Sequence, residues 1–237
     1  MIDSARFPTR RATLAAILAM TVAACSDNSS QQQSQAQPAK NVDPVKTAAT
    51  APEADGSVDM EKLLQPGALP DKFLGDASAP VTIVEYASMT CGHCAHFHET
   101  TLPAIKEKYI DTGKARLILR EFPFDPRAAA AFMLARCAPN DNYFPMIDVL
   151  FHQQDAWARA EDAQGALLQI SRQAGFTKDS FESCLRDQAL LDNVTAVKQR
   201  GENDFGVNAT PTFFINGKKY GGSLSVEQMS AVIDSLL

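Results

Sequence analysis

The sequence predicts an α/β domain with one small sheet and a block of helices placed between its strands. Three observations predict this class. Residues 81–86 form a β-branched run, residues 125–200 show helical spacing with no strand signal, and residues 212–220 form a strand, a turn and a second strand. The chain of 237 residues is 45% hydrophobic, which is enough apolar material for one substantial domain or two small ones.

Residues 1–25 indicate export. Three arginines precede an apolar run at 12–24 that is too short to span a bilayer as a mature helix. The run ends in Val22-Ala23-Ala24-Cys25, which resembles a bacterial lipoprotein cleavage box. We therefore expect Cys25 to be acylated and to become the new N-terminus. The alternative is an ordinary signal peptide in which Cys25 is incidental, and the export route, Sec or Tat, stays open.

Residues 26–58 predict a flexible tether, because they are rich in Gln, Ser, Ala, Asn and Pro and have almost no large apolar side chains. The folded domain is expected at residues 59–237. Residues 26–237 carry 19 basic and 27 acidic groups, a balance that argues against nucleic acid as a partner.

The first half of the domain predicts a strand, a helix and a second strand. The strand at 81–86 contains one charged residue, Glu85. Apolar residues then recur at helical spacing from Ala95 to about residue 109, with Pro103 expected to bend the helix and Gly113 to end it. Residues 116–120 predict the second strand.

The second half predicts the helical block and the return to the sheet. Asp125-Pro126 has the form of an N-cap followed by a proline at the first helical position. Helices are expected at about 126–137, 144–151, 162–174 and 178–200, so that the inserted helical subdomain spans about 125–200. Strand character returns at 212–215 and 218–220 around the turn pair Asn216-Gly217, and residues 226–237 predict a final helix.

The chemistry is predicted at Cys91-Gly92-His93-Cys94, where the first strand ends and its helix begins. Unpaired amides and the positive end of the helix dipole favour a thiolate at Cys91. Cys94 lies one turn further on, so the two sulfurs can form and break a disulfide with little movement. Cys91 is therefore expected to attack and Cys94 to resolve the mixed disulfide.

Two neighbours are expected to support the pair. A protonated His93 imidazole would stabilise the Cys91 thiolate, and a more stable reduced form makes a stronger oxidant. If Glu85 is buried, its carboxylate would accept a proton from Cys94 through water. The alternative for Glu85 is an exposed strand residue.

A structural disulfide or half of a zinc site is the alternative for Cys91 and Cys94. The nearby histidines His93, His96 and His98 are the other candidate zinc ligands. Structural zinc sites usually combine ligands from separate segments, so this reading is the weaker one, and we expect no bound metal or other cofactor.

The Cys-X-X-Cys pair together with Ala209-Thr210-Pro211-Thr212-Phe213 resembles the thioredoxin superfamily, and the helical block between the two motifs resembles its DsbA-like branch. The resemblance covers about residues 60–237. It implies a thioredoxin-like fold with an inserted helical domain, a cis-proline at Pro211 beside the disulfide, and a substrate platform formed by Thr210 and Pro211. Most DsbA-type enzymes have Pro-His between the cysteines, whereas this chain has Gly-His, as protein disulfide isomerases do. Because Gly92 stands where most DsbA-type enzymes have proline, the resemblance does not fix the redox potential of the pair.

Cys137 and Cys184 fall on the apolar faces of predicted helices in the inserted block. In an oxidising compartment we expect a structural disulfide between them. Buried free thiols are the alternative.

The sequence thus predicts a monomeric, periplasmic thiol:disulfide oxidoreductase that oxidises exported proteins with free cysteines and is held to a membrane by Cys25. The resemblance implies reoxidation by a quinone-linked membrane partner. An isomerase or reductase is the nearest rival, but such enzymes often dimerise through an added N-terminal domain, for which residues 59–75 are too short. A lipoprotein that handles copper or zinc is the alternative from another class.

Overall fold

The computed structural model describes residues 50–237. The predictions of a signal peptide at 1–25, of a lipid anchor at Cys25 and of a tether over residues 26–49 lie outside this range. Residues 50–58 are described, and they contradict the end of the predicted tether. Asp55 N donates to Lys219 O at 2.8 Å, and residues 56 and 57 pair with the last hairpin of the sheet.

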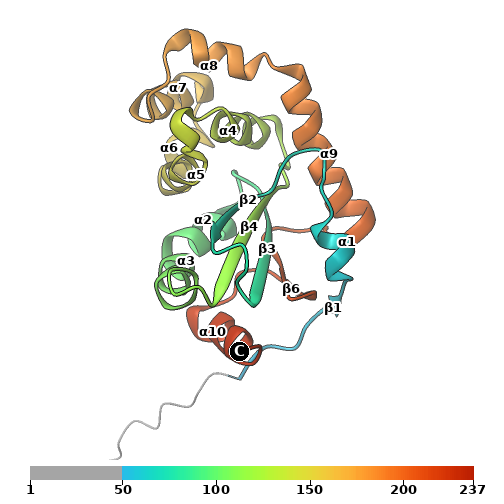
Figure 1. Ribbon diagram of the computed structural model, residues 1–237. Coiled ribbons are helices and arrows are strands. Elements are labelled where there is room, and N and C mark those ends of the chain that lie inside the picture. Colours follow the sequence, from blue (N-terminus) through green and yellow to red (C-terminus); the bar gives the residue numbers. More distant parts are fainter. Residues whose placement is uncertain (1–49) are drawn as a thin grey trace, which may run out of the picture. The chain divides into compact units, whose positions relative to one another are not determined.

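One six-stranded sheet, in the order β1-β6-β5-β3-β4-β2, forms the centre of the fold (Figure 1). Its strands are β1 (Gly56–Ser57), β2 (Lys72–Gly75), β3 (Val81–Ala87), β4 (Ala115–Glu121), β5 (Thr212–Ile215) and β6 (Lys218–Gly221). β3 and β4 are parallel because a helical crossover joins them, and the other neighbours are antiparallel. The predicted α/β class is confirmed.

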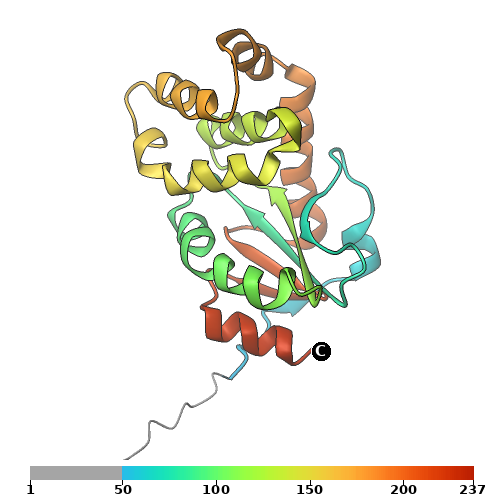
Figure 2. The same ribbon diagram turned by 60° about the vertical axis from the view of Figure 1, so that its left-hand side comes forward.

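Helices occupy both faces of the sheet and one end of it (Figures 1 and 2). They are α1 (Met60–Leu64), α2 (Gly92–His96), η1 (Phe97–Thr101), α3 (Leu102–Ile105), η2 (Lys106–Ile110), α4 (Pro126–Arg136), η3 (Pro139–Asp141), α5 (Tyr143–His152), α6 (Gln154–Trp157), α7 (Ala163–Gln173), α8 (Lys178–Leu185), α9 (Gln188–Phe205) and α10 (Val226–Asp234). Since side chains alternate along β3, Ile83 packs on the face covered by α3 and α10, and Val84 packs on the face that carries α1 and the end of α9. Helices α4 to α8 share a third apolar cluster with Cys94 and Ala95.

The helix after Cys91 runs from α2 to η2 and contains two wider turns. Leu102 N donates to Phe97 O and Asp111 N donates to Lys106 O, both with the i→i−5 spacing of a π-turn. Pro103 follows the first of these turns, and it has no N–H with which to continue the α-helical pattern. The expected bend at Pro103 therefore takes the form of a π-turn.

Two further features differ from the sequence prediction, and a third agrees with it. The single helix expected at 178–200 is two helices, because Asp187 caps a new helix by accepting from Leu190 N at 3.0 Å. Strands β1 and β2 were not predicted, because their pairing partners are distant in the sequence and each strand has only two or four residues. At the last hairpin, Asn216 and Gly217 both have positive φ, as the turn prediction requires.

A disulfide joins Cys137, which ends α4, to Cys184 in α8, with 6.2 Å between the Cα atoms. It closes a loop across the helical block, with a sequence separation of 47 residues. Cys91 and Cys94 are free thiols.

We expect that replacing both Cys137 and Cys184 with alanine lowers the free energy of unfolding by about 2–4 kcal/mol, because the unfolded chain gains the freedom of the opened loop. Urea denaturation of the full-length chain measures this. The comparison is made in a Cys91→Ala/Cys94→Ala background, so that only one disulfide is varied. Equal urea midpoints with and without Cys137 and Cys184 would show that the bond does not constrain the fold.

Candidate active site

The junction of β3 and α2 places Cys91 at the start of a helix. Cys91 is the N-cap residue of α2, with extended backbone angles, and Ala95 N donates to Cys91 O at 3.1 Å. Its own N–H donates to Ser88 O at 3.0 Å, which fixes the turn between strand and helix. Cys91 therefore lies at the end of the helix where the first-turn amides have no main-chain partner.

A second segment reaches the same sulfur from the other end of the domain. The peptide bond between Thr210 and Pro211 is cis, and Cys91 Sγ lies 3.3 Å from Thr210 O, to which it can donate a hydrogen bond while it is protonated. Gly222 N donates to Pro211 O at 2.9 Å, so the loop is tied to the end of the last hairpin. The structure thus brings together Cys91, Thr210 and Pro211, which the sequence had assigned to one site.

The Cys91 pKa is lowered from 9.0 to about 5. The largest cause is a hydrogen bond from the Cys94 thiol to the Cys91 sulfur, which stabilises the thiolate. Partial burial opposes this, and contacts with Thr210 and with the main-chain amides of Cys94 and His93 lower the pKa further. Cys91 is half-buried, and with this pKa it is ionised at neutral pH, as the sulfur that attacks a disulfide has to be.

Cys94 has the opposite properties. Its side chain is fully buried, and burial raises its pKa well above 9.0. Donating a hydrogen bond to Cys91 raises it further, as does the negative charge of Glu85. Cys94 is therefore a thiol at neutral pH and needs a proton acceptor when it attacks.

Glu85 is fully buried in β3, which excludes the exposed alternative. Its Oε2 lies 3.0 Å from His98 Nε2, and its Oε1 has no hydrogen-bond partner. The sequence did not predict the contact with His98, which appeared there only as a candidate zinc ligand. The signal was present, since a carboxyl buried in a strand needs a partner.

His93 and Gly92 are both exposed at the start of α2. The contact that lowers the Cys91 pKa comes from the main-chain amide of His93, and the proposed role of its imidazole stays a prediction. His93 O accepts from the hydroxyl of Ser223 at 2.9 Å, so the loop after β6 holds the first turn of the helix.

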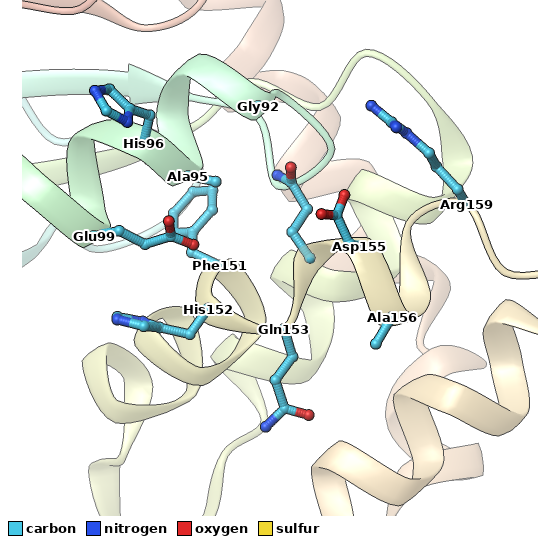
Figure 3. Close-up of a pocket in the computed structure, with 11 residues that line it drawn as sticks. Gly92, Ala95, His96, Glu99, Phe151, His152, Gln153, Asp155, Ala156 and Arg159 are labelled. Atoms are coloured by element: carbon cyan, nitrogen blue, oxygen red, sulfur yellow. The ribbon is translucent and has the colours of Figure 1, made fainter. Parts of the chain in front are cut away.

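Gln154, in the helical block, was not predicted as a site residue. Its side-chain amide donates to Met89 O at 2.8 Å and to Cys91 O at 3.1 Å, on either side of Thr90. It also borders a hollow of about 450 Å³ beside Gly92, whose walls come from α2 and from the end of α5 with α6 (Figure 3). The block therefore braces the turn that carries Cys91, a role visible only once the fold is known.

Within residues 50–237, no three His, Cys, Asp or Glu side chains lie together as a metal site would require. His98, one of the candidate zinc ligands, has its Nε2 3.0 Å from Glu85 Oε2. In the same range, no helix has the length and hydropathy needed to cross a bilayer.

Comparison with known proteins gives consistent matches. The family model described as thioredoxin matches residues 68–235. The crystal structure of alpha-DsbA1 from Wolbachia pipientis is 38% identical, covers 74% of this chain and 94% of its own, and superposes with a TM-score of 0.68. BdbD from Bacillus subtilis shares the fold, with a TM-score of 0.64 and 18% identity. The match covers 79% of this chain and 98% of BdbD. The thioredoxin-like fold with inserted helices is thereby confirmed.

Curated relatives match over a smaller part of their length. A Rickettsia conorii protein named "Putative protein-disulfide oxidoreductase" is 35% identical over 173 residues, which is 70% of this chain and 60% of the relative. A Rickettsia felis protein of the same description is 33% identical over 168 residues, again 60% of its length. The chain therefore spans about 60% of these relatives.

The lowered pKa of Cys91 predicts its reactivity. As pH rises through about 5, Cys91 becomes ionised, so the rate of iodoacetamide alkylation at Cys91 should rise to a plateau with a midpoint near pH 5. A free cysteine, with a pKa of about 8.5, is almost fully protonated at pH 6 and should react much more slowly there. Mass spectrometry of the alkylated chain measures both rates. A Cys91 that reacts no faster than free cysteine at pH 6 would contradict the assignment.

The hydrogen bond from Cys94 can be tested separately. Replacing Cys94 with alanine removes the donor and should move the midpoint of Cys91 alkylation to higher pH. Cys94→Ser is the matched control, because a hydroxyl of similar size can still donate, and its midpoint should stay closer to that of the unmodified chain. Equal midpoints in the alanine and serine variants would show that this bond does not set the pKa.

Proposed function

This chain belongs to the thioredoxin family, in its DsbA-type branch, and we propose that it catalyses thiol:disulfide exchange on exported proteins through Cys91 and Cys94. The observation that carries the proposal is the contrast between the two sulfurs, one ionised and half-exposed and the other protonated and buried. Such a contrast suits a pair in which one sulfur meets the client and the other closes the cycle.

In the oxidising direction, a client thiolate attacks Cys91 of the Cys91–Cys94 disulfide. The bond between the two enzyme sulfurs breaks, a bond from the client to Cys91 forms, and Cys94 leaves with the electron pair and takes up a proton. A second client thiolate then attacks the client sulfur that is bonded to Cys91. The Cys91 sulfur leaves as a thiolate. The client gains a disulfide and the enzyme pair is reduced, with no bound cofactor needed.

We propose that the net direction in the cell is oxidation. Stabilising the Cys91 thiolate favours the reduced enzyme, and a pair whose reduced form is favoured passes its disulfide to clients more readily. β5 itself pairs with β3 and β6, so the main chain at Thr210 and Pro211, just before this strand, is proposed to bind the client as an extended segment beside Cys91. Thr210 and Pro211 would form the floor of that site.

Export and anchoring complete the proposal. A signal peptide at residues 1–25 and an acylated Cys25 would hold the domain at a membrane on the periplasmic side, where disulfides persist. A quinone-linked membrane protein would reoxidise the pair, and the enzyme would act as a monomer. These points rest on the sequence and on the DsbA-type relationship.

The alternative functions differ in a measurable way. An isomerase or reductase would be kept reduced in cells, whereas an oxidase would be found mostly oxidised. A copper- or zinc-handling lipoprotein would purify with one stoichiometric metal that is lost on changing Cys91, which elemental analysis detects.

We expect the Cys91–Cys94 pair, equilibrated with glutathione, to have a reduction potential above the range of about −230 to −200 mV found for glutaredoxins. The physical reason is the low pKa of Cys91, which stabilises the reduced form. Cys94→Ala serves as the control, since without Cys94 only a mixed disulfide with glutathione can form. A potential near the roughly −270 mV of thioredoxin would favour the reductase instead.

A further inference from the structure

The reaction leaves one proton transfer without a route. Cys94 must gain a proton when it leaves the disulfide and lose one when it attacks, yet its side chain is fully buried. Glu85 is close enough for its charge to raise the pKa of Cys94, but it is fully buried as well. A proton that reaches Glu85 from Cys94 therefore needs a further step to reach water.

His98 provides that step by its position. Its Nε2 lies 3.0 Å from Glu85 Oε2, the residue is 3% exposed, and its ring stacks on Phe151 of α5 with 4.3 Å between the ring centres. Since Nε2 faces Glu85, Nδ1 is the nitrogen left to exchange a proton on the other side of the ring.

His98 is also one of the residues that line a groove of about 480 Å³ between the helix after Cys91 and α5. Its lining includes His98, Leu102, Phe144 and Ile147, with Lys106 and Asp148 as its charged members. His98 therefore borders both the buried carboxyl and a space open to water.

We propose that Glu85 and His98 form a proton relay that connects the buried Cys94 to this groove, with His98 acting through Glu85 and not on the sulfurs. During resolution the Cys94 proton passes to Glu85 Oε1, which has no other partner in the structure. The carboxyl group then turns so that its protonated oxygen faces His98 Nε2 and passes that proton on, and His98 releases its Nδ1 proton to water. In the oxidising direction the same steps run inward, so no proton is created or lost.

Other titratable groups near the relay have partners of their own. Glu121 accepts from Arg136 at 2.6 Å and from the Tyr143 hydroxyl at 2.9 Å. Tyr143 is fully enclosed and its pKa is raised well above 10.0, first by burial, so it stays protonated. Lys106 forms an ion pair with Asp111, and the Asp148 carboxylate lies 3.4 Å from His152 Nδ1. His98 is thus the group that links Glu85 to the groove.

The inference rests on the proposed function, and the reaction with Ellman's reagent separates the two. In the reduced full-length chain, Cys91 attacks the reagent and releases one thionitrobenzoate in a phase whose rate depends on reagent concentration. Cys94 then loses its proton and attacks Cys91, and a second thionitrobenzoate leaves as a thiolate at a rate independent of reagent concentration. If the first phase is absent, the proposed exchange chemistry fails. The relay concerns the second phase alone.

We expect His98→Ala to slow the second phase by between about tenfold and a hundredfold near pH 7 and to leave the first phase unchanged. Added imidazole should enter the groove and restore the rate, whereas pyrazole, which has the same shape but is a far weaker base, should not. Glu85→Gln should be slow and should not respond to imidazole. His152→Ala removes an exposed histidine of α5 and is the matched control, with both phases unchanged.

His98→Gln keeps the test decisive if the alanine variant does not fold. Glutamine can still hydrogen-bond Glu85 but cannot carry a proton at neutral pH, so the relay predicts a slow second phase in a chain whose urea midpoint is close to normal. A normal second phase in His98→Gln would overturn the proposal, as it would show that His98 only holds Glu85 in place. Rescue of His98→Ala by pyrazole as well as by imidazole would overturn it too, because filling the space would then be sufficient.

Discussion

The hydrogen bond from the Cys94 thiol to the Cys91 sulfur makes two chemically identical side chains behave differently. It places the charge on the sulfur at the mouth of the helix and the proton on the sulfur inside it. This division requires that Cys94 be buried, and its burial in turn depends on the helices packed over α2. The inserted block is therefore part of the redox chemistry as well as a covering for the sheet.

The contacts of the block show how it takes part. Gln154 holds the carbonyls of Met89 and Cys91, and Asp125 both caps α4 and accepts from the hydroxyl of Thr90 at 2.5 Å. Phe151 packs flat against His98. Each contact joins a residue of the insertion to the segment that carries the cysteines. A sheet without the inserted helices would lack these contacts. The hydrogen bond from Cys91 N to Ser88 O would remain, because it lies within the turn itself.

The sequence was sufficient for features set by short-range patterns. The strand at Val81–Ala87, the cap at Asp125, the Asn216-Gly217 turn and the thiol pair were all predicted from neighbouring residues. Features that depend on distant partners were predicted only where the cysteines or the family resemblance indicated them, as for the Cys137–Cys184 disulfide. β2 exists because it pairs with β4, and Gln154 and Ser223 join the site only through contacts across more than 60 residues. Glu85 is an intermediate case, because its charge within an apolar strand indicated a role but not its pairing with His98.

The pairing of β1 with β6 attaches the N-terminal segment to the folded domain. Asp55 contributes both its main-chain N–H, to Lys219, and its carboxylate, which accepts from Gly221 N at 2.7 Å. Any tension transmitted along the N-terminal segment therefore reaches the domain at an outer strand of the sheet, whereas Cys91 follows the central strand β3. A force on the N-terminal segment would act first on the pairing of β1 with β6, and the strand that leads to Cys91 would not bear it directly.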